Sequence, residues 1–134
     1  MPDTPLSIET WFRSKRIAVC GATPRPEKWG YKVFKRLLDA GYDAIPVHPV
    51  ADQIEGHACV HSLRDIQPPP DAISVITPPQ VSLEIVRTSH DLNSIPIWFQ
   101  PGSADEQVLE EAKRLGVPVI MGPCVLVELG KRGF

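Results

Sequence analysis

The chain has 134 residues, of which 43% are hydrophobic and 22% are charged, and its formal net charge is −2. This length fits a single domain, residues 1–134, and the composition excludes a disordered chain because enough apolar residues are present for one core. The slightly acidic balance weighs against a dedicated nucleic-acid binder, since such proteins usually carry a basic face.

The cysteines and the apolar segments indicate where the protein resides. The three cysteines include no CxxC pair and do not form a disulfide framework, which favours a reducing compartment. Residues 1–6 show no basic segment leading into an apolar run, so no signal peptide is predicted. No apolar stretch approaches the roughly 20 residues that span a bilayer. We therefore expect a cytoplasmic protein that does not act at a membrane.

The first predicted elements alternate between helix and strand. Residues 6–13 are predicted to form a short leading helix that Ser7 caps. Residues 17–20 are an uninterrupted apolar run, which is typical of a buried parallel strand. Residues 21–30 contain two glycines and two prolines and are predicted to be a loop. A helix over residues 31–40 follows, because its apolar residues recur at helical spacing.

The rest of the chain continues the alternation. The remaining predicted segments are strands at residues 44–47, 72–76, 95–99 and 117–121, a candidate short strand at 58–60, a helical turn at 62–66, and helices after 77–79 and 100–103. The order β-α-β-(β)-β-α-β-α-β implies an α/β fold, in which helices flank a parallel sheet of about five strands. In such sheets ligands sit beyond the carboxyl ends of the strands, where the winding reverses. The loops at residues 21–30, 48–50, 77–80 and 100–103 are therefore the ones to examine.

The loop after the first strand has the strongest local signal. It leads into a helix N-terminus, where unpaired N–H groups and the helix dipole favour an anion. Gly21 lets an anion approach the backbone, Thr23 supplies a hydroxyl, and Arg25 and Lys28 supply two cations. Together they predict a phosphate or pyrophosphate site, although a surface loop whose cations face water remains the alternative.

The spacing of the residues in this loop reduces the number of possible ligands. It matches neither the G-x-G-x-x-G fingerprint nor the P-loop pattern. The residues after the second strand, His48, Pro49 and Val50, include no acidic side chain that holds a ribose in the usual NAD manner. These features disfavour NAD and leave another phosphate-bearing ligand.

Several motifs resemble one protein family. Residues 21–33 resemble the signature of the small stand-alone CoA-binding domain proteins, which runs Gly-x-Ser/Thr, a proline-containing stretch, a basic residue and Ser-Tyr-x-Val. The tripeptide at residues 47–49 resembles the family's Val-Asn-Pro. Residues 121–124 resemble the end of the related domain in acyl-CoA synthetases and the succinyl-CoA synthetase α chain. The resemblance extends from about residue 15 to residue 128.

This resemblance implies a single Rossmann-like, doubly wound domain that binds coenzyme A. The implied contacts are Gly21, Ala22, Thr23, Arg25 and Lys28 with the phosphates, Val47, His48 and Pro49 beside the adenosine, Ile76, Thr77 and Pro78 along the groove, and Trp29 as a stacking partner or cover. Two positions depart from the family. Val50 stands where the family has lysine, which removes a cation near the adenosine phosphates. Gly30 replaces the serine before Tyr31, which removes an expected helix cap.

Other candidate sites have weaker support. His57, Cys59 and His61 have a spacing at which a metal site is conceivable, but no further ligand lies nearby to complete a tetrahedral set. A solvated loop is therefore favoured there, and no metal is predicted. Cys124 follows the last strand, and a mixed disulfide between its thiol and that of coenzyme A is a minor hypothesis.

The sequence favours a non-catalytic coenzyme A-binding protein, because no Ser–His–Asp or Cys–His arrangement can be assembled. Its expected ligand is coenzyme A or an acyl-CoA, and a protein partner or homodimer remains open. The alternatives are a subunit or fragment of an acyl-CoA ligase, a small NAD(P)-binding protein, and an interaction domain whose pocket has decayed.

Overall fold

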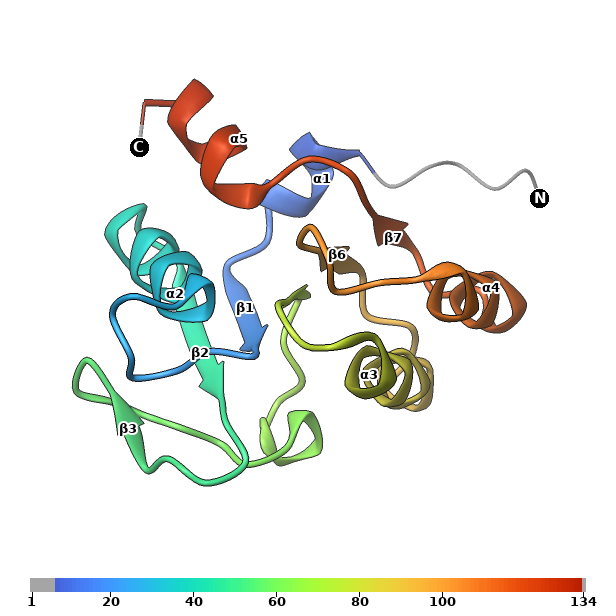
Figure 1. Cartoon of the computed structure of the whole chain (residues 1–134), viewed down its shortest axis with the longest axis horizontal. Coiled ribbons are helices and arrows are strands. Elements are labelled where there is room, and N and C mark those ends of the chain that lie inside the picture. The colour runs from blue at the N-terminus through green and yellow to red at the C-terminus, as the bar shows by residue number, and fades with distance from the viewer. Residues whose placement is uncertain (1–6, 134) are drawn as a thin grey trace.

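Alternating strands and helices build the computed structural model, which describes residues 7–133 (Figure 1). The elements are α1 (Ile8–Phe12), β1 (Arg16–Cys20), α2 (Trp29–Asp39), β2 (Asp43–Val47), β3 (Gln53–Ile54), β4 (His57–Ala58), the 3₁₀ turn η1 (Leu63–Asp65), β5 (Ala72–Val75), α3 (Pro79–Asp91), β6 (Ile97–Phe99), α4 (Glu106–Leu115), β7 (Val119–Ile120) and α5 (Val125–Lys131). Within these residues no helix combines the length and the apolarity that crossing a bilayer requires.

Five parallel strands form the central sheet in the order β2-β1-β5-β6-β7. The chain winds outward from β1 to β2, then crosses back over β1 to β5 and continues through β6 to β7. The winding therefore reverses between β1 and β5, and the crevice beyond their carboxyl ends is the expected ligand position. The predicted α/β, doubly wound sheet of about five strands is confirmed.

Helices cover both faces of this sheet, as apolar runs in the strands require. Ile17 and Val19 of β1 pack into one core with residues of α1, α2 and α5. Ala18 and Cys20, which point to the opposite face, join a second core with residues of α3 and α4. Figure 1 shows the same division, with α1, α2 and α5 on one side of the sheet and α3 and α4 on the other. β1 is therefore buried on both faces.

The chain differs from the sequence-based expectation in several elements. The leading helix begins at Ile8 with Ser7 as its cap, while Leu6 of the predicted span lies outside the described residues. The candidate strand at residues 58–60 is divided: β4 pairs with β3 in a separate antiparallel hairpin, and Val60 forms an isolated parallel bridge to Val47. Helix α5 was not predicted at all.

The expectation that Gly30 removes a helix cap is wrong, as the start of α2 shows. The helix begins at Trp29, and Lys28 is the capping residue, without a side-chain cap hydrogen bond. Gly30 therefore occupies the second helical position, and its replacement of a serine does not remove the cap.

Candidate functional site

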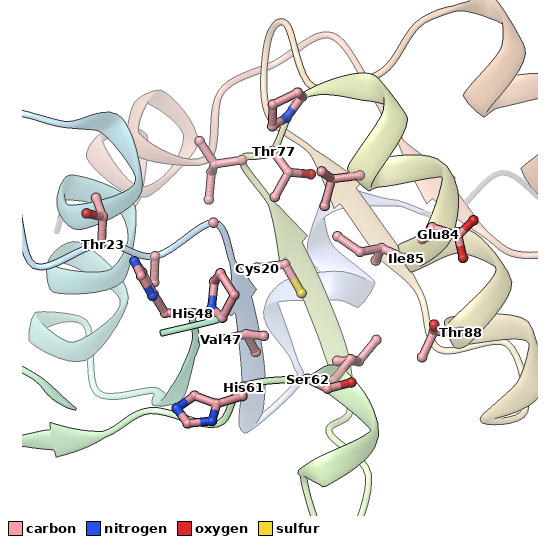
Figure 2. Close-up of a pocket in the computed structure, with 17 residues that line it drawn as sticks. Cys20, Thr23, Val47, His48, His61, Ser62, Thr77, Glu84, Ile85 and Thr88 are labelled. Carbon is pink, nitrogen blue, oxygen red and sulfur yellow. The ribbon is translucent and has the colours of Figure 1, made fainter. Parts of the chain in front are cut away.

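Two adjoining cavities open at the switch point, and they share Gly21, Thr23, His48 and Ile76. The first, which we call the apolar groove, has a volume of about 450 Å³ and lies between the strand ends and α3 (Figure 2). Its lining residues are Cys20, Gly21, Ala22, Thr23, Val47, His48, Pro49, His61, Ser62, Leu63, Ile76, Thr77, Pro78, Val81, Glu84, Ile85 and Thr88. The second, the cationic mouth, has a volume of about 500 Å³. Its lining residues are Gly21, Thr23, Arg25, Lys28, Trp29, Gly30, His48 and Ile76.

Two glycines allow the backbones around the mouth to approach closely. A β-carbon on Gly21, whose φ is +98°, would lie 2.2 Å from the carbonyl oxygen of Ile76. A β-carbon on Gly30 would lie 2.0 Å from the carbonyl oxygen of Gly21. The end of β5, the loop after β1 and the first turn of α2 are therefore in direct backbone contact, which only glycine permits.

The first turn of α2 supplies hydrogen-bond donors to the cationic mouth. The amides of Trp29, Gly30 and Tyr31 belong to this turn, where a helix offers no backbone acceptors of its own. Arg25 and Lys28 are exposed, and within the described residues neither side chain forms an ion pair. These groups give the mouth a positive electrostatic potential that suits a phosphate group.

Helix α3 also begins at the switch point, but its N-terminus offers fewer donors. Pro79, its first residue, has no amide hydrogen. The amides of Val81 and Ser82 both donate to the carbonyl oxygen of Pro78, at 3.0 Å each. The hydroxyls of Ser82 and Thr77 bond to each other at 2.8 Å. An anion is therefore better served at the start of α2 than at the start of α3.

The apolar groove has a thiol among its lining groups. Figure 2 places the sulfur of Cys20 between His48 and Thr23 on one side and Ile85 of α3 on the other. Burial raises the pKa of the Cys20 thiol to about 12, so it stays protonated at neutral pH. A protonated, buried thiol is a poor nucleophile, and Cys20 acts as an apolar lining group. The burial of Cys20 agrees with the buried strand predicted at residues 17–20.

His48 is held in place on several sides. Its amide donates to the carbonyl oxygen of Val60 at 3.0 Å. Its Nδ1 atom accepts hydrogen bonds from the amides of Val50 and Ala51, at 3.0 and 2.8 Å. Val50 is 76% exposed, and as a valine it supplies no cation at this position.

All of the residues predicted to bind the ligand line one or both cavities. Those in the groove are Gly21, Ala22, Thr23, Val47, His48, Pro49, Ile76, Thr77 and Pro78, and those confined to the mouth are Arg25, Lys28 and Trp29. The structure brings them together, while their role in binding stays a prediction. Ala22 is 1% exposed and its amide donates to the carbonyl oxygen of Val19 at 3.4 Å, so it offers a ligand little free surface.

Sequence reasoning missed one wall of the groove. Val81, Ile85 and Thr88 recur at helical spacing on α3, and the same spacing that predicts a core-facing stripe also places them along the groove. His61 and Ser62 precede η1 and join the lining because the bridge between Val60 and Val47 brings their segment beside β2.

Two other expected contributors lie elsewhere. Gln100, in the fourth loop singled out, is 1% exposed and turned inward, where its Oε1 accepts the amide of Val125 at 2.8 Å. Cys124 caps α5 and lines neither the groove nor the mouth. Within the described residues no group of three or more potential metal ligands is present.

Comparisons with known proteins bear on the family and the fold of the chain. A family model described as a CoA binding domain matches residues 15–130. The Bacillus subtilis (strain 168) protein YneT, described as uncharacterized, is 35% identical over 115 residues, which cover 86% of this chain and 85% of YneT. A solved structure of a conserved hypothetical protein from Pyrococcus furiosus superposes with a TM-score of 0.81 at 34% identity, covering 85% of this chain and 98% of that one.

A longer relative carries an enzyme name. The α subunit of the ADP-forming acetate–CoA ligase I from Pyrococcus furiosus is 29% identical over 128 residues. The match covers 96% of this chain but 24% of the ligase subunit. This chain thus corresponds to about a quarter of that subunit's length.

Proposed function

The chain belongs to the CoA-binding domain family, and we propose that it binds coenzyme A or an acyl-CoA across the cationic mouth and the apolar groove. The observation that carries this proposal is the junction of the two cavities at Gly21, Thr23, His48 and Ile76. Coenzyme A has an anionic diphosphate joined to a long, uncharged pantetheine arm. A cationic cavity continuous with an apolar one complements both parts.

The diphosphate is assigned to the start of α2. There the free amides of the first turn, the Thr23 hydroxyl and the side chains of Arg25 and Lys28 lie around one opening. Charged hydrogen bonds of this kind are about twice as strong as neutral ones, so they account for much of the affinity. Trp29, which is 45% exposed at the same opening, is available to cover or stack on the bound ligand.

The role we propose is binding without catalysis. Among the described residues that line the cavities, Cys20 is protonated, and Glu84 is paired with Arg87 at 2.9 Å. The Thr23 hydroxyl accepts a hydrogen bond from the amide of Arg25, at 3.4 Å. None of these contacts joins a nucleophile to a general base.

A second candidate role, as the CoA-binding part of an acyl-CoA ligase, draws support from the acetate–CoA ligase subunit that matches nearly the whole chain. The two roles share one ligand site. They differ in whether a separate chain that supplies the chemistry associates with this one. Adding such ligase subunits and assaying acyl-CoA formation would separate the roles.

The proposed ligand site is tested by isothermal titration calorimetry. We expect coenzyme A to bind more tightly than NAD, and Lys28→Ala to weaken binding by about 1–3 kcal/mol, the cost of losing a charge-assisted contact. Lys113→Ala is the matched control, because Lys113 is an exposed cation on α4 that lines neither cavity. Equal affinities for coenzyme A and NAD, or a Lys28→Ala protein that binds like the wild type, would contradict the proposal.

A further inference from the structure

His48 lies where the two cavities meet, and its two ring nitrogens have different surroundings. The side chain is half-buried and lines both the groove and the mouth. Figure 2 shows the imidazole on the same side of the groove as Thr23, opposite α3. Any ligand that passes from the mouth into the groove must pass beside this ring.

Nδ1 of His48 is used entirely by the protein. The amides of Val50 and Ala51 both donate to it, at 3.0 and 2.8 Å. A nitrogen that accepts two N–H donors through its lone pair carries no proton. The ring nitrogen thereby does the work that an Asn or Asp side-chain oxygen does in a turn that bonds to its own backbone.

The protonation pattern follows from this arrangement. A neutral imidazole has one N–H, and with Nδ1 fixed as an acceptor the hydrogen is on Nε2. Within the described residues Nε2 makes no hydrogen bond, although the turn fixes the orientation of the ring. The turn therefore leaves one oriented and unused donor at the junction of the two cavities.

Building on the binding function proposed above, we propose that His48 is a specificity-determining residue, whose Nε2–H donates to an oxygen atom of the bound CoA ligand. The His48 ring contributes an uncharged hydrogen-bond donor in a loop whose residue 50 is a valine and supplies no cation. The donor thus selects a ligand with an acceptor oxygen between its anionic and apolar parts, whereas Arg25 and Lys28 select for negative charge.

The backbone around His48 makes the donor's position specific. The bridge between Val47 and Val60 fixes the end of β2, and the Val60 amide donates to the Pro46 carbonyl oxygen at 3.0 Å. The position of the ring is thus set by β2, by the segment that follows the hairpin and by the turn that its own Nδ1 closes. A donor fixed in advance binds its acceptor with little loss of side-chain entropy.

The variant His48→Asn separates the two roles of the ring, which are to accept the turn amides through Nδ1 and to donate to the ligand through Nε2. Its Oδ1 takes the place of Nδ1 as the acceptor of the turn, while its amide nitrogen falls short of the Nε2 position. We expect His48→Asn to keep the melting temperature of the wild type and to bind coenzyme A about tenfold more weakly, the loss expected for one hydrogen bond. His48→Ala removes both roles and should show a lower melting temperature as well as weaker binding.

A measurement on the wild-type protein makes the test independent of any variant's folding. In ¹⁵N NMR spectra of the ring, the free protein should show Nε2 protonated and Nδ1 unprotonated, and coenzyme A should shift the Nε2 resonance. A protonated Nδ1, an Nε2 resonance that coenzyme A leaves unchanged while it binds, or a His48→Asn protein with wild-type affinity would each overturn the inference. Failure of the wild type to bind coenzyme A would instead refute the proposed function, and the ring spectrum would still report whether the turn fixes the tautomer.

Discussion

Position 30 has no room for a β-carbon, because the backbone of Gly21 lies against it at the cationic mouth. Gly30 lies in the first turn of α2 with its α-carbon against the backbone of Gly21, and an added β-carbon would meet the carbonyl oxygen there at 2.0 Å. The φ angle of Gly30 is not in the left-handed region, so the constraint is one of space and not of backbone conformation. The close contact between the loop after β1 and the first turn of α2 therefore requires glycine at position 30.

We expect Gly30→Ala to lower the free energy of unfolding by about 2 kcal/mol or more, since a backbone atom must move to admit the methyl group. The same variant should weaken coenzyme A binding, because the displaced turn carries the amides that we propose bind the phosphates. Thermal and urea unfolding, with calorimetry for the ligand, measure both effects.

Gly130→Ala is the matched control for this change. Gly130 also lies inside a helix, but outside its chain neighbours and the backbone of its own helix no atom stands within 4 Å of the position that its β-carbon would take. Alanine should therefore stabilise the protein by up to about 1 kcal/mol through helix propensity alone. If Gly30→Ala were as stable as Gly130→Ala, the close approach would not exist as described.

Among the elements, α3 forms one wall of the groove and is joined to α4 by charged side chains. Glu111 of α4 accepts from Nε of Arg114 at 2.7 Å and from Nε of Arg87 of α3 at 2.8 Å. The hydrogen bonds from Arg114 and then from Arg87 lower the pKa of Glu111 to about 2. The ion pair between Arg87 and Glu111 connects the groove wall to the neighbouring helix, while Arg114 holds Glu111 from within α4.

The pH dependence of this contact follows from the direction of the shift. A carboxyl whose pKa is depressed in the folded state stabilises the protein above its ordinary pKa of 4.5, and this contribution is lost as the pH falls towards 2. We expect Glu111→Gln to be less stable than the wild type at pH 6, and the difference to shrink as the pH approaches 2.

Urea unfolding at a series of pH values measures this difference. Glu110→Gln is the control, since Glu110 is exposed on the same helix and forms no ion pair within the described residues. A stability difference between wild type and Glu111→Gln that stays constant from pH 6 to pH 2 would contradict the assignment of this stabilising contact to an ionised Glu111 carboxylate.

Over the whole molecule, the elements that the sequence predicts well are those with a strong local pattern. The apolar run at residues 17–20 requires burial on both faces, and the helical spacing in α2 and α4 is regular, so both the sheet and its winding were predictable. The loops around the site could then be located, because parallel strands all end at one edge of the sheet.

The features that the sequence did not predict depend on contacts between distant segments. Helix α5 is short, and its N-terminal amide at Val125 is tied to the side chain of Gln100, which lies 25 residues earlier. The two hydrogen bonds to Nδ1 of His48 depend on a turn that the spacing of apolar residues does not predict. The groove wall of α3 was not predicted, because a helical stripe facing a cavity has the same spacing as one facing a core.

The most direct test of the account is a crystal structure of the protein with coenzyme A. The account predicts the diphosphate at the first turn of α2, between Thr23, Arg25 and Lys28, with the rest of the ligand running past His48 into the apolar groove. Coenzyme A bound elsewhere, with the cationic mouth empty or filled by its own side chains, would contradict the account.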